Sequence, residues 1–402
     1  MKRKLSLLLA ALAAAGALSV SALATEAEPP AQENQEQTRE ETVTVPDPEG
    51  TVTWENLRSR IQEGSLSLQS LTESIGSIQA IDYDKMAEVL REQINAIGKA
   101  SRSGGTSVSA SASSLRDTFE DLLDGDYQAD NDDVIWQLRD ASNQVVSAGE
   151  NLYITLVGME QSAQDMERDL DALDRRLEDA RLRLELGQGS RQTVKDLEQS
   201  RTEMASQLNT LNTNISKYKS QLQTLLGETP TGELTLGELP GEEEMDWSEP
   251  DYETDLAAAK TASWTLRSAE KTLEDAEEDW KDAKKYAGSK PKYELEVAEH
   301  TWNSAQLTYE SAVQDFETSF KQLYDALADY EQVLESRKSA LDYQEEQLTV
   351  TEKKYELGRA SRYDVLTARD NVAAAQSDVD STWRDLFSAR NSYQWAVEYG
   401  LL

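Results

Sequence analysis

The sequence predicts an all-α protein built from two copies of a long antiparallel coiled-coil hairpin. Three observations predict this fold class. Apolar residues recur at alternating steps of three and four along much of the chain, glycine turns interrupt these runs at two places, and the two halves match when one is shifted by 171 positions. Two heptad helices joined by a short turn run antiparallel, so each half is expected to bury its two apolar stripes together.

The first residues have the order of a secretory signal peptide. Three basic residues, Lys2 to Lys4, precede an apolar run over 5–20, and Ala22-Leu23-Ala24 then forms a cleavage motif. The run is shorter than the about 20 residues of a transmembrane helix, and no later stretch approaches that length. We therefore expect export, cleavage after residue 24 and no transmembrane helix in the mature chain. Residues 25–50 are polar, acidic and proline-bearing, which predicts a disordered leader.

The composition argues against several classes of function. The chain has 76 acidic and 40 basic residues, a net charge of −36, which disfavours nucleic acid as a partner. It has no cysteine and one histidine, His300, so thiol nucleophiles, histidine triads and the usual zinc sites are excluded. The acidic segment 124–133 lacks the EF-hand order and is expected to be a solvated loop whose Asp133 caps the next helix. We expect no enzyme, no cofactor and no metal.

The first helical repeat is expected over 51–227. A helical stretch runs from Trp54 to about Ala100 and is followed by a Ser/Gly-rich segment. A regular apolar seam then extends from Leu152 to Leu184, stops at a turn over 187–190, and resumes from Val194 to Leu225. These positions predict the first hairpin.

The second helical repeat is expected over 253–402, after an acidic inter-repeat linker over 228–252. Its first seam runs from Ala259 to Ala283 and is interrupted by glycine and proline at 288–291. A long helix is predicted from about 293 to 357, then a turn over 358–361, then a seam of smaller residues from Val365 to Ala396. These positions predict the second hairpin.

The 171-residue shift gives 13 identities in the 42 positions from Glu150 to Arg191, without a gap. Identities occur at exposed positions and also at seam positions. We therefore interpret the two hairpins as copies of one unit rather than as two unrelated coiled coils. At the two turns the same residue types recur in the same order. Glu185, Leu186, Gly187, Ser190 and Arg191 fall on Glu356, Leu357, Gly358, Ser361 and Arg362.

The second turn also carries a recognisable pattern. Residues 355–369 (YELGRASRYDVLTAR), followed by alanine-rich heptads, closely resemble the C-terminal repeat of TolC-family outer membrane efflux proteins. The segment 225–230 (LLGETP) with Leu239-Pro240 is similar to the linker between the two halves of that family. The resemblance covers roughly residues 50–402 and is strongest from 320 onward.

The resemblance implies a homotrimer of duplicated hairpins, which forms a helical conduit or docking stalk for an adaptor protein and an inner-membrane transporter in an efflux or export system. The turn tips then become the adaptor contacts. The candidate contact residues are Gly187, Ser190, Arg191, Gly358, Ser361 and Arg362. Physical chemistry alone also expects these glycines to close tight turns and these serines to cap the following helices.

One feature departs from the family. Each half should carry two membrane strands of about 9 to 11 residues with alternating apolar side chains, and neither the Ser/Gly-rich stretch 104–113 nor the short gap 287–292 supplies them. We therefore expect little or no β-barrel. The location expected from the resemblance is the outer membrane, and otherwise the periplasm or the cell exterior. The alternative function is a secreted coiled-coil protein with a structural or cell-wall regulatory role and no part in transport.

Overall fold

The computed structural model describes residues 47–48, 50–102, 109–242, 245, 249–286 and 292–402. Nearly all of these residues lie in helices, which confirms the predicted all-α class. The predicted signal peptide and residues 25–46 and 49 of the predicted leader lie outside the described part. None of the described helices is both long enough and apolar enough to cross a membrane.

The described residues form two compact units. The smaller unit holds Ser67–Ser142, and the larger unit holds Asp47–Leu66 and Asn143–Leu402. The long helix α6 (Asp126–Glu185) contributes its first turns to the smaller unit and the rest to the larger one.

The smaller unit contains most of α3 (Leu66–Gln79), then α4 (Tyr83–Arg102), α5 (Ser109–Asp124) and the start of α6. Its core is an apolar cluster in which Ile78 of α3 packs with Ile135 and Leu138 of α6. The Asn131 amide also donates to the Tyr83 hydroxyl at 3.1 Å.

Two details of the sequence prediction are wrong in the smaller unit. Residues 126–133 are not a loop, because α6 begins at Asp126, directly after Gly125. Asp133 therefore lies inside the helix and does not cap it. Burial of Ile135 and Leu138 stabilises this part of α6, and the dipole of the helix favours acidic residues in its first turn. The Ser/Gly-rich segment is helical from Ser109 onward, while 103–108 lie outside the described residues.

The larger unit contains the rest of the elements. They are β1 (Thr51–Val52), α2 (Trp54–Gly64), α7 (Arg191–Leu225), β2 (Thr235–Leu236), α8 (Tyr252–Ala262), α9 (Trp264–Lys285), α10 (Lys292–Glu356) and α11 (Arg362–Tyr399). The two strands pair in parallel, with Thr51 opposite Thr235 and Val52 opposite Leu236.

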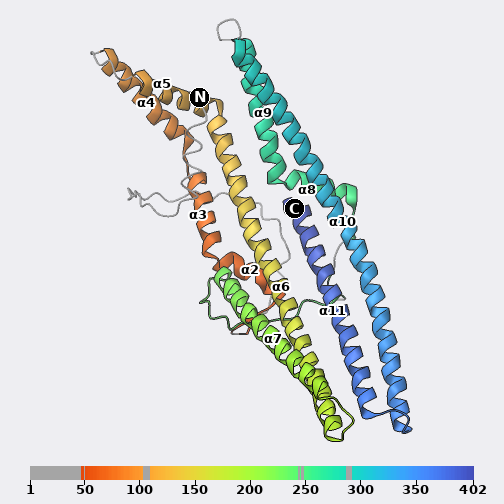
Figure 1. Ribbon diagram of the computed structural model, residues 1–402. Helices are drawn as coiled ribbons and strands as arrows, with labels where there is room; N and C mark the ends of the chain where they lie inside the picture. Colours follow the sequence, from red (N-terminus) through yellow and green to blue (C-terminus); the bar gives the residue numbers. More distant parts are fainter. Residues whose placement is uncertain (1–46, 49, 103–108, 243–244, 246–248, 287–291) are drawn as a thin grey trace. The chain divides into compact units, whose positions relative to one another are not determined.

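Four long helices of the larger unit lie side by side in the order α7, α6, α11, α10 (Figure 1). Three ion pairs cross this layer at one level. Arg201 of α7 pairs with Asp174 of α6 at 2.5 Å, and the neighbouring Arg175 pairs with Asp370 of α11 at 2.7 Å. Arg369 of α11 then pairs with Glu352 of α10 at 2.8 Å. Each exposed ion pair of this kind contributes at most about 1 kcal/mol to stability. The three pairs therefore show which residues of neighbouring helices lie opposite one another, but they contribute little to holding the helices together.

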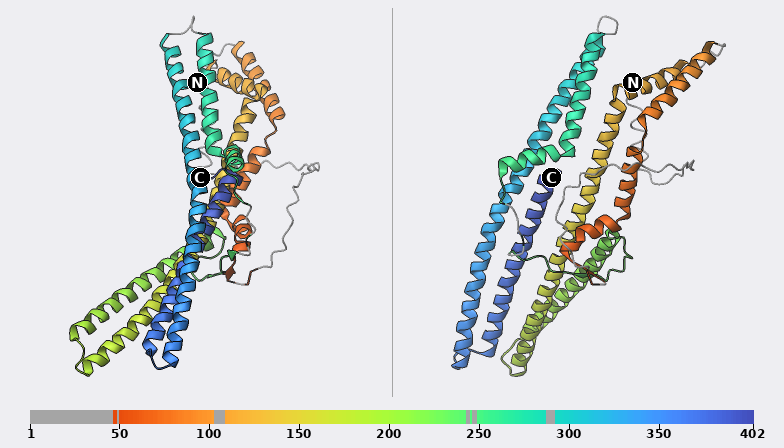
Figure 2. Two further views of the ribbon diagram at one scale, coloured as in Figure 1. Left: turned by 90° about the vertical axis from the view of Figure 1, so that its right-hand side faces the viewer. Right: turned by 180° about the vertical axis from the view of Figure 1, so that it is seen from behind.

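Apolar packing holds the layer together. The predicted seam from Leu152 to Leu184 is buried or half-buried at every position, and so is the seam from Val365 to Ala396. In the seam of α7, Arg201 is the exposed exception, which its pairing with Asp174 explains. The views in Figure 2 show the resulting pair of hairpins, α6 with α7 and α10 with α11.

Shorter elements pack onto the middle of α10 and onto the end of α11 that lies away from its turn. Phe316, Phe320 and Leu327 of α10 meet Tyr393 and Ala396 of α11 in one buried cluster. Two residues of α8 and α9 complete the cluster; they are Ala259 and Leu266.

Candidate functional site

The first hairpin turn lies between α6 and α7 and has the geometry of a glycine-terminated helix. Gly187 has φ +72°, and its N–H donates to the Leu184 carbonyl at 3.0 Å. The Gln188 N–H donates to the Arg183 carbonyl at 2.8 Å, which completes a Schellman motif. Ser190 then caps α7, because its hydroxyl accepts the Gln192 N–H at 3.1 Å.

The second hairpin turn, between α10 and α11, repeats this geometry. Gly358 has φ +69°, and its N–H donates to the Tyr355 carbonyl at 2.9 Å. The Arg359 N–H donates to the Lys354 carbonyl at 2.7 Å. The expectation that the glycines close tight turns and the serines cap the next helices is therefore confirmed in both copies.

The second turn has an additional interaction at its cap. Ser361 accepts the Asp364 N–H at 3.1 Å, and the Asp364 carboxylate accepts the Ser361 N–H at 2.7 Å, which is a complete capping box. The pKa of Asp364 is held below its usual range by these hydrogen bonds, first by the Ser361 N–H and then by the Ser361 hydroxyl. The equivalent position of the first copy is Thr193, which has no carboxylate to supply this second bond.

The two turns lie at the same end of the larger unit. Glu150 of α6 contacts Asn391 of α11, Arg168 contacts the Ala373 carbonyl, and Arg175 contacts Asp370. Residue numbers rise along α6 as they fall along α11, so these helices are antiparallel. The last turn of α6 and the first turn of α11 therefore lie at the same end of the larger unit.

The structure thus brings the six predicted contact residues to one end, three in each turn. We call residues 181–195 and their counterparts 352–366 the tips. Gly187, Ser190 and Arg191 are exposed in the first tip, as are Gly358, Ser361 and Arg362 in the second.

The prediction omitted the apolar side chains that stand out at the tips. Leu186 is 65% exposed and Leu357 is 70% exposed, one at the same position of each turn. The repeat alignment already paired these two leucines, and Leu186 lies two residues after the last seam position, Leu184, so it falls outside the seam spacing. Each leucine directly precedes the glycine of its Schellman turn, where the chain leaves one helix and crosses to the next.

The opposite ends of the hairpins contain a buried polar network that the sequence did not predict. The Glu150 carboxylate, which is 2% exposed, accepts from Arg58 of α2 at 2.7 Å, and from Asn391 and Trp395 of α11 at 3.0 and 2.6 Å. The Arg58 guanidinium also lies 4.6 Å from the centre of the Trp395 ring. One carboxylate therefore connects three helices that are far apart in the sequence.

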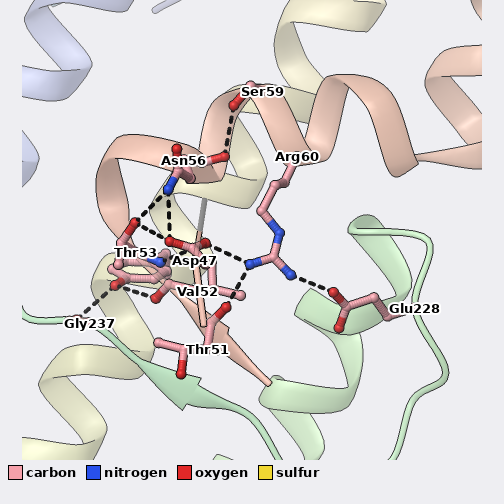
Figure 3. Close-up of polar contacts among 10 residues, drawn as sticks. Asp47, Thr51, Val52, Thr53, Asn56, Ser59, Arg60, Glu228 and Gly237 are labelled. Atoms are coloured by element: carbon pink, nitrogen blue, oxygen red, sulfur yellow. Dashed lines mark hydrogen bonds and ion pairs between the residues drawn. The ribbon is translucent and has the colours of Figure 1, made fainter. Parts of the chain in front are cut away.

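A second network fixes the start of the described chain against the inter-repeat segment (Figure 3). The Asp47 carboxylate accepts from Thr53, Asn56 and Arg60. Burial raises the pKa of Asp47, but these hydrogen bonds outweigh it and hold the pKa below its usual range. Arg60 also pairs with Glu228, just after α7, at 2.5 Å.

Close backbone contacts accompany these networks at the ends of α7 and α11. A Cβ added at Gly227, which has φ +71°, would lie 2.1 Å from the Gly64 carbonyl oxygen. A Cβ added at Gly400, which has φ +66°, would lie 2.3 Å from the Ser263 Cα. We call these two contacts the junctions. Each joins the end of a post-turn helix to the end of a short helix, α2 or α8.

Comparison with known proteins shows similarity of structure. The outer membrane protein VceC of Vibrio cholerae is 14% identical, with a TM-score of 0.52, and the match covers 87% of this chain and 96% of that one. The outer membrane channel MtrE of Neisseria gonorrhoeae, solved in its open state, is 15% identical, with a TM-score of 0.53 and coverages of 86% and 88%. The outer membrane channel CmeC of Campylobacter jejuni is 13% identical, with a TM-score of 0.53 and coverages of 71% and 68%.

No protein-family model matches the sequence, and no curated protein matches it. The likeness therefore concerns the fold. The solved structures are channels and outer membrane proteins rather than enzymes. On the evidence of its helix order, its paired turns and these structures, the chain has a TolC-like fold.

Proposed function

We propose that this chain is the protomer of a TolC-like conduit in the cell envelope. Three copies would close their four-helix layers into a helical tunnel, and the paired tips would meet a periplasmic-type adaptor that is linked to an inner-membrane transporter. The observation that carries the proposal is the single antiparallel layer α7, α6, α11, α10 with both turns at one end. The similar structures named above are channels that use this fold.

The edge of the layer supports assembly with further copies. On α10, the side chains of Val333, Tyr343 and Val350 are 43%, 57% and 41% exposed. At about 100° per residue they fall within roughly 100° of the helix circumference; Tyr343 and Val350 lie opposite Leu334 and Leu341, and Val333 lies at the side. An apolar stripe on the outer side of an edge helix is suited to packing against the α7 edge of a neighbouring copy.

The mass of the purified, processed full-length chain in mild detergent tests this proposal. Light scattering is expected to give three times the mass of one chain. The double variant Tyr343→Glu with Val350→Glu is expected to shift the mass toward one chain, because it places charges in the proposed contact. The control is Val297→Glu, since this valine is also exposed on α10, at 60%, but lies outside the four-helix layer.

One result would contradict the conduit, and a second would contradict the proposed contact. A wild-type chain that stays monomeric over a wide concentration range would leave no closed tunnel. A trimer that survives the double variant but is lost in the control would place the contact elsewhere. A stable monomer would instead favour the secreted coiled-coil role considered from the sequence.

A further inference from the structure

The hairpin formed by α9 and α10 has an end that lies outside the four-helix layer. The helix α10 is 65 residues long, so its start lies about 95 Å from the Gly358 turn at 1.5 Å per residue. Figure 1 shows the end of α9 and the start of α10 together, away from the turn between α10 and α11. We call Lys284, Lys285, Tyr286 and Tyr293 the distal end.

Aromatic side chains gather at and beside the distal end. Trp280 of α9 stacks on Trp302 of α10, with ring centres 4.7 Å apart, and both tryptophans are half-buried. Tyr286 directly follows α9 and is 45% exposed, and Tyr293 is the second residue of α10 and is 63% exposed. The tryptophans therefore close the hairpin from inside, while the tyrosines present ring surface to the outside.

Lysines accompany these rings. The Lys284 ammonium lies 4.6 Å from the centre of the Trp280 ring, and the Lys285 ammonium lies 5.4 Å from the centre of the Tyr286 ring. Both lysines are exposed. The sequence from 284 to 293 contains four lysines and no acidic residue, although the whole chain has a net charge of −36. The distal end is therefore a basic, aromatic surface on an acidic protein.

The helix dipole explains only part of this pattern. Lys284 and Lys285 lie in the last turn of α9, where the negative end of the dipole favours a cation. Residues 353–355 repeat the order Lys-Lys-Tyr at the end of α10, but there Glu356 follows directly. The dipole accounts for neither the lack of acids at the distal end nor the exposure of its two tyrosines.

Exposed tyrosines beside lysines are typical of a membrane–water interface. A tyrosine ring is apolar and ends in a polar hydroxyl, so it fits among lipid headgroups, and a lysine reaches headgroup phosphates with its long stem. Protein interfaces are instead enriched in arginine and depleted in lysine. Residues 268–336, which include the distal end, contain no arginine. An anionic lipid surface therefore fits the distal end better than a protein partner does.

We infer that the distal end binds the surface of a bilayer that contains anionic phospholipid. Tyr286 and Tyr293 enter the headgroup layer, while Lys284 and Lys285 contact the headgroup phosphates. The attachment is peripheral, so it is reversible and weakens as the ionic strength rises. A single copy of the chain carries the whole surface, and the inference therefore does not depend on the proposed trimer.

The test measures how much of the full processed chain floats with lipid vesicles, at a detergent concentration too low to form micelles. One set of vesicles is an equimolar mixture of phosphatidylcholine and phosphatidylglycerol, and the other is phosphatidylcholine alone. The first variant is Lys284→Gln with Lys285→Gln. Its control is Lys353→Gln with Lys354→Gln, which removes the same lysine pair from the last turn of α10.

A second variant tests the apolar part of the contact without changing the charge. It is Tyr286→Ser with Tyr293→Ser. Its control is Tyr355→Ser with Tyr363→Ser, because these tyrosines flank the second hairpin turn and are each 48% exposed. All eight replaced side chains are exposed, so the four variants are expected to unfold at nearly the same temperature as the wild type.

We expect the wild type to bind the anionic vesicles, to bind the neutral ones far more weakly, and to lose most of its binding as sodium chloride rises from about 0.05 to 0.5 M. The lysine variant should bind the anionic vesicles about tenfold more weakly or less. The tyrosine variant should lose about fivefold and keep its dependence on salt. Each control variant should lose less than about twofold, since it leaves the distal end unchanged.

Several results would overturn the inference. They are a lack of binding to either kind of vesicle, equal binding to anionic and neutral vesicles, and a control variant that loses as much as the matching variant of the distal end. Displacement of the chain from the vesicles by inorganic phosphate, but not by chloride at the same ionic strength, would show a site for the free ion instead. None of these results changes the mass of the chain, so the proposed function is tested separately.

Discussion

The tips and the junctions use the same local device for different purposes. In all four places a helix ends at a glycine with positive φ: Gly187 and Gly358 at the tips, Gly227 and Gly400 at the junctions. No atom lies within 4 Å of a Cβ added at either tip glycine, whereas such a Cβ would overlap backbone at either junction. The tips are therefore built for exposure and the junctions for close packing. This difference separates the surface that can meet a partner from the joint that holds the hairpins.

The largest expected effect is at a junction. Gly227→Ala would place a methyl group 2.1 Å from the Gly64 carbonyl oxygen, and neither backbone can move without displacing α2 or α7. We expect the free energy of unfolding to fall by about 3 kcal/mol or more, measured by urea denaturation. Gly76→Ala in α3 is the control, because its added Cβ meets no atom within 4 Å, and it should be neutral or stabilising. Equal effects at the two positions would show that the junction contact does not form.

The next effect is expected at the buried carboxylate beside the first junction. Glu150→Ala leaves the donors of Arg58, Asn391 and Trp395 without their shared acceptor. Since Arg58 keeps partial access to water, we expect a loss of about 2–3 kcal/mol rather than the full penalty of an isolated buried charge. Glu185→Ala at the exposed first tip should change stability by less than about 0.5 kcal/mol. A small effect at Glu150 would mean that α2 does not dock on α11 in solution.

A smaller effect is expected at the tip glycines. Gly358→Ala has room for its methyl group, so only the left-handed backbone opposes it, at a cost of about 1 kcal/mol. Gly358→Asn should recover part of this loss, since asparagine tolerates the left-handed conformation. The urea midpoints of the two variants check this order. A loss at Gly358 as large as that at Gly227 would remove the distinction between tips and junctions.

The smallest expected effect distinguishes the two tips from each other. The folded pKa of Asp364 lies below that of a free carboxyl, so its hydrogen bonds to Ser361 contribute stability at pH values above the usual carboxyl range. That contribution is lost as the pH falls through the lowered pKa, when the carboxylate is protonated. Protection factors from hydrogen exchange should therefore decrease at the start of α11 below about pH 4, and Asp364→Asn should abolish this dependence. The start of α7, with Thr193 in place of the acid, should show no such change.

The sequence predicts the tips well because their structure is local. The glycine that ends α6 or α10 and the serine that caps the next helix act within about six residues, and the repeat places them twice. The long helices were also predicted, since their seams are regular over many heptads. The exposed leucines of the tips were missed, because the repeat alignment treats Leu186 and Leu357 only as matched positions.

The junctions and their networks could not be predicted in the same way. Glu150 meets Arg58 across 92 positions and Trp395 across 245, and no local pattern marks a glutamate as buried. The linker expected over 228–252 likewise gave no sign that Thr235 and Leu236 would pair with β1, or that the Pro240 carbonyl would accept from Trp383. Such contacts join segments that are far apart in the sequence, and periodicity does not reveal them.

The central claim is that the two tips lie at one end of a single antiparallel layer. The chain has no cysteine, so spin labels can be attached at chosen positions without background. Double electron–electron resonance on Gln188→Cys with Arg359→Cys should give a distance below about 45 Å, because the helices meet at Arg175 and Asp370 and rise 1.5 Å per residue. Gln188→Cys with Glu398→Cys should give a clearly longer distance, of about 60 Å. The reverse order, with residue 188 nearer to 398 than to 359, would contradict the account.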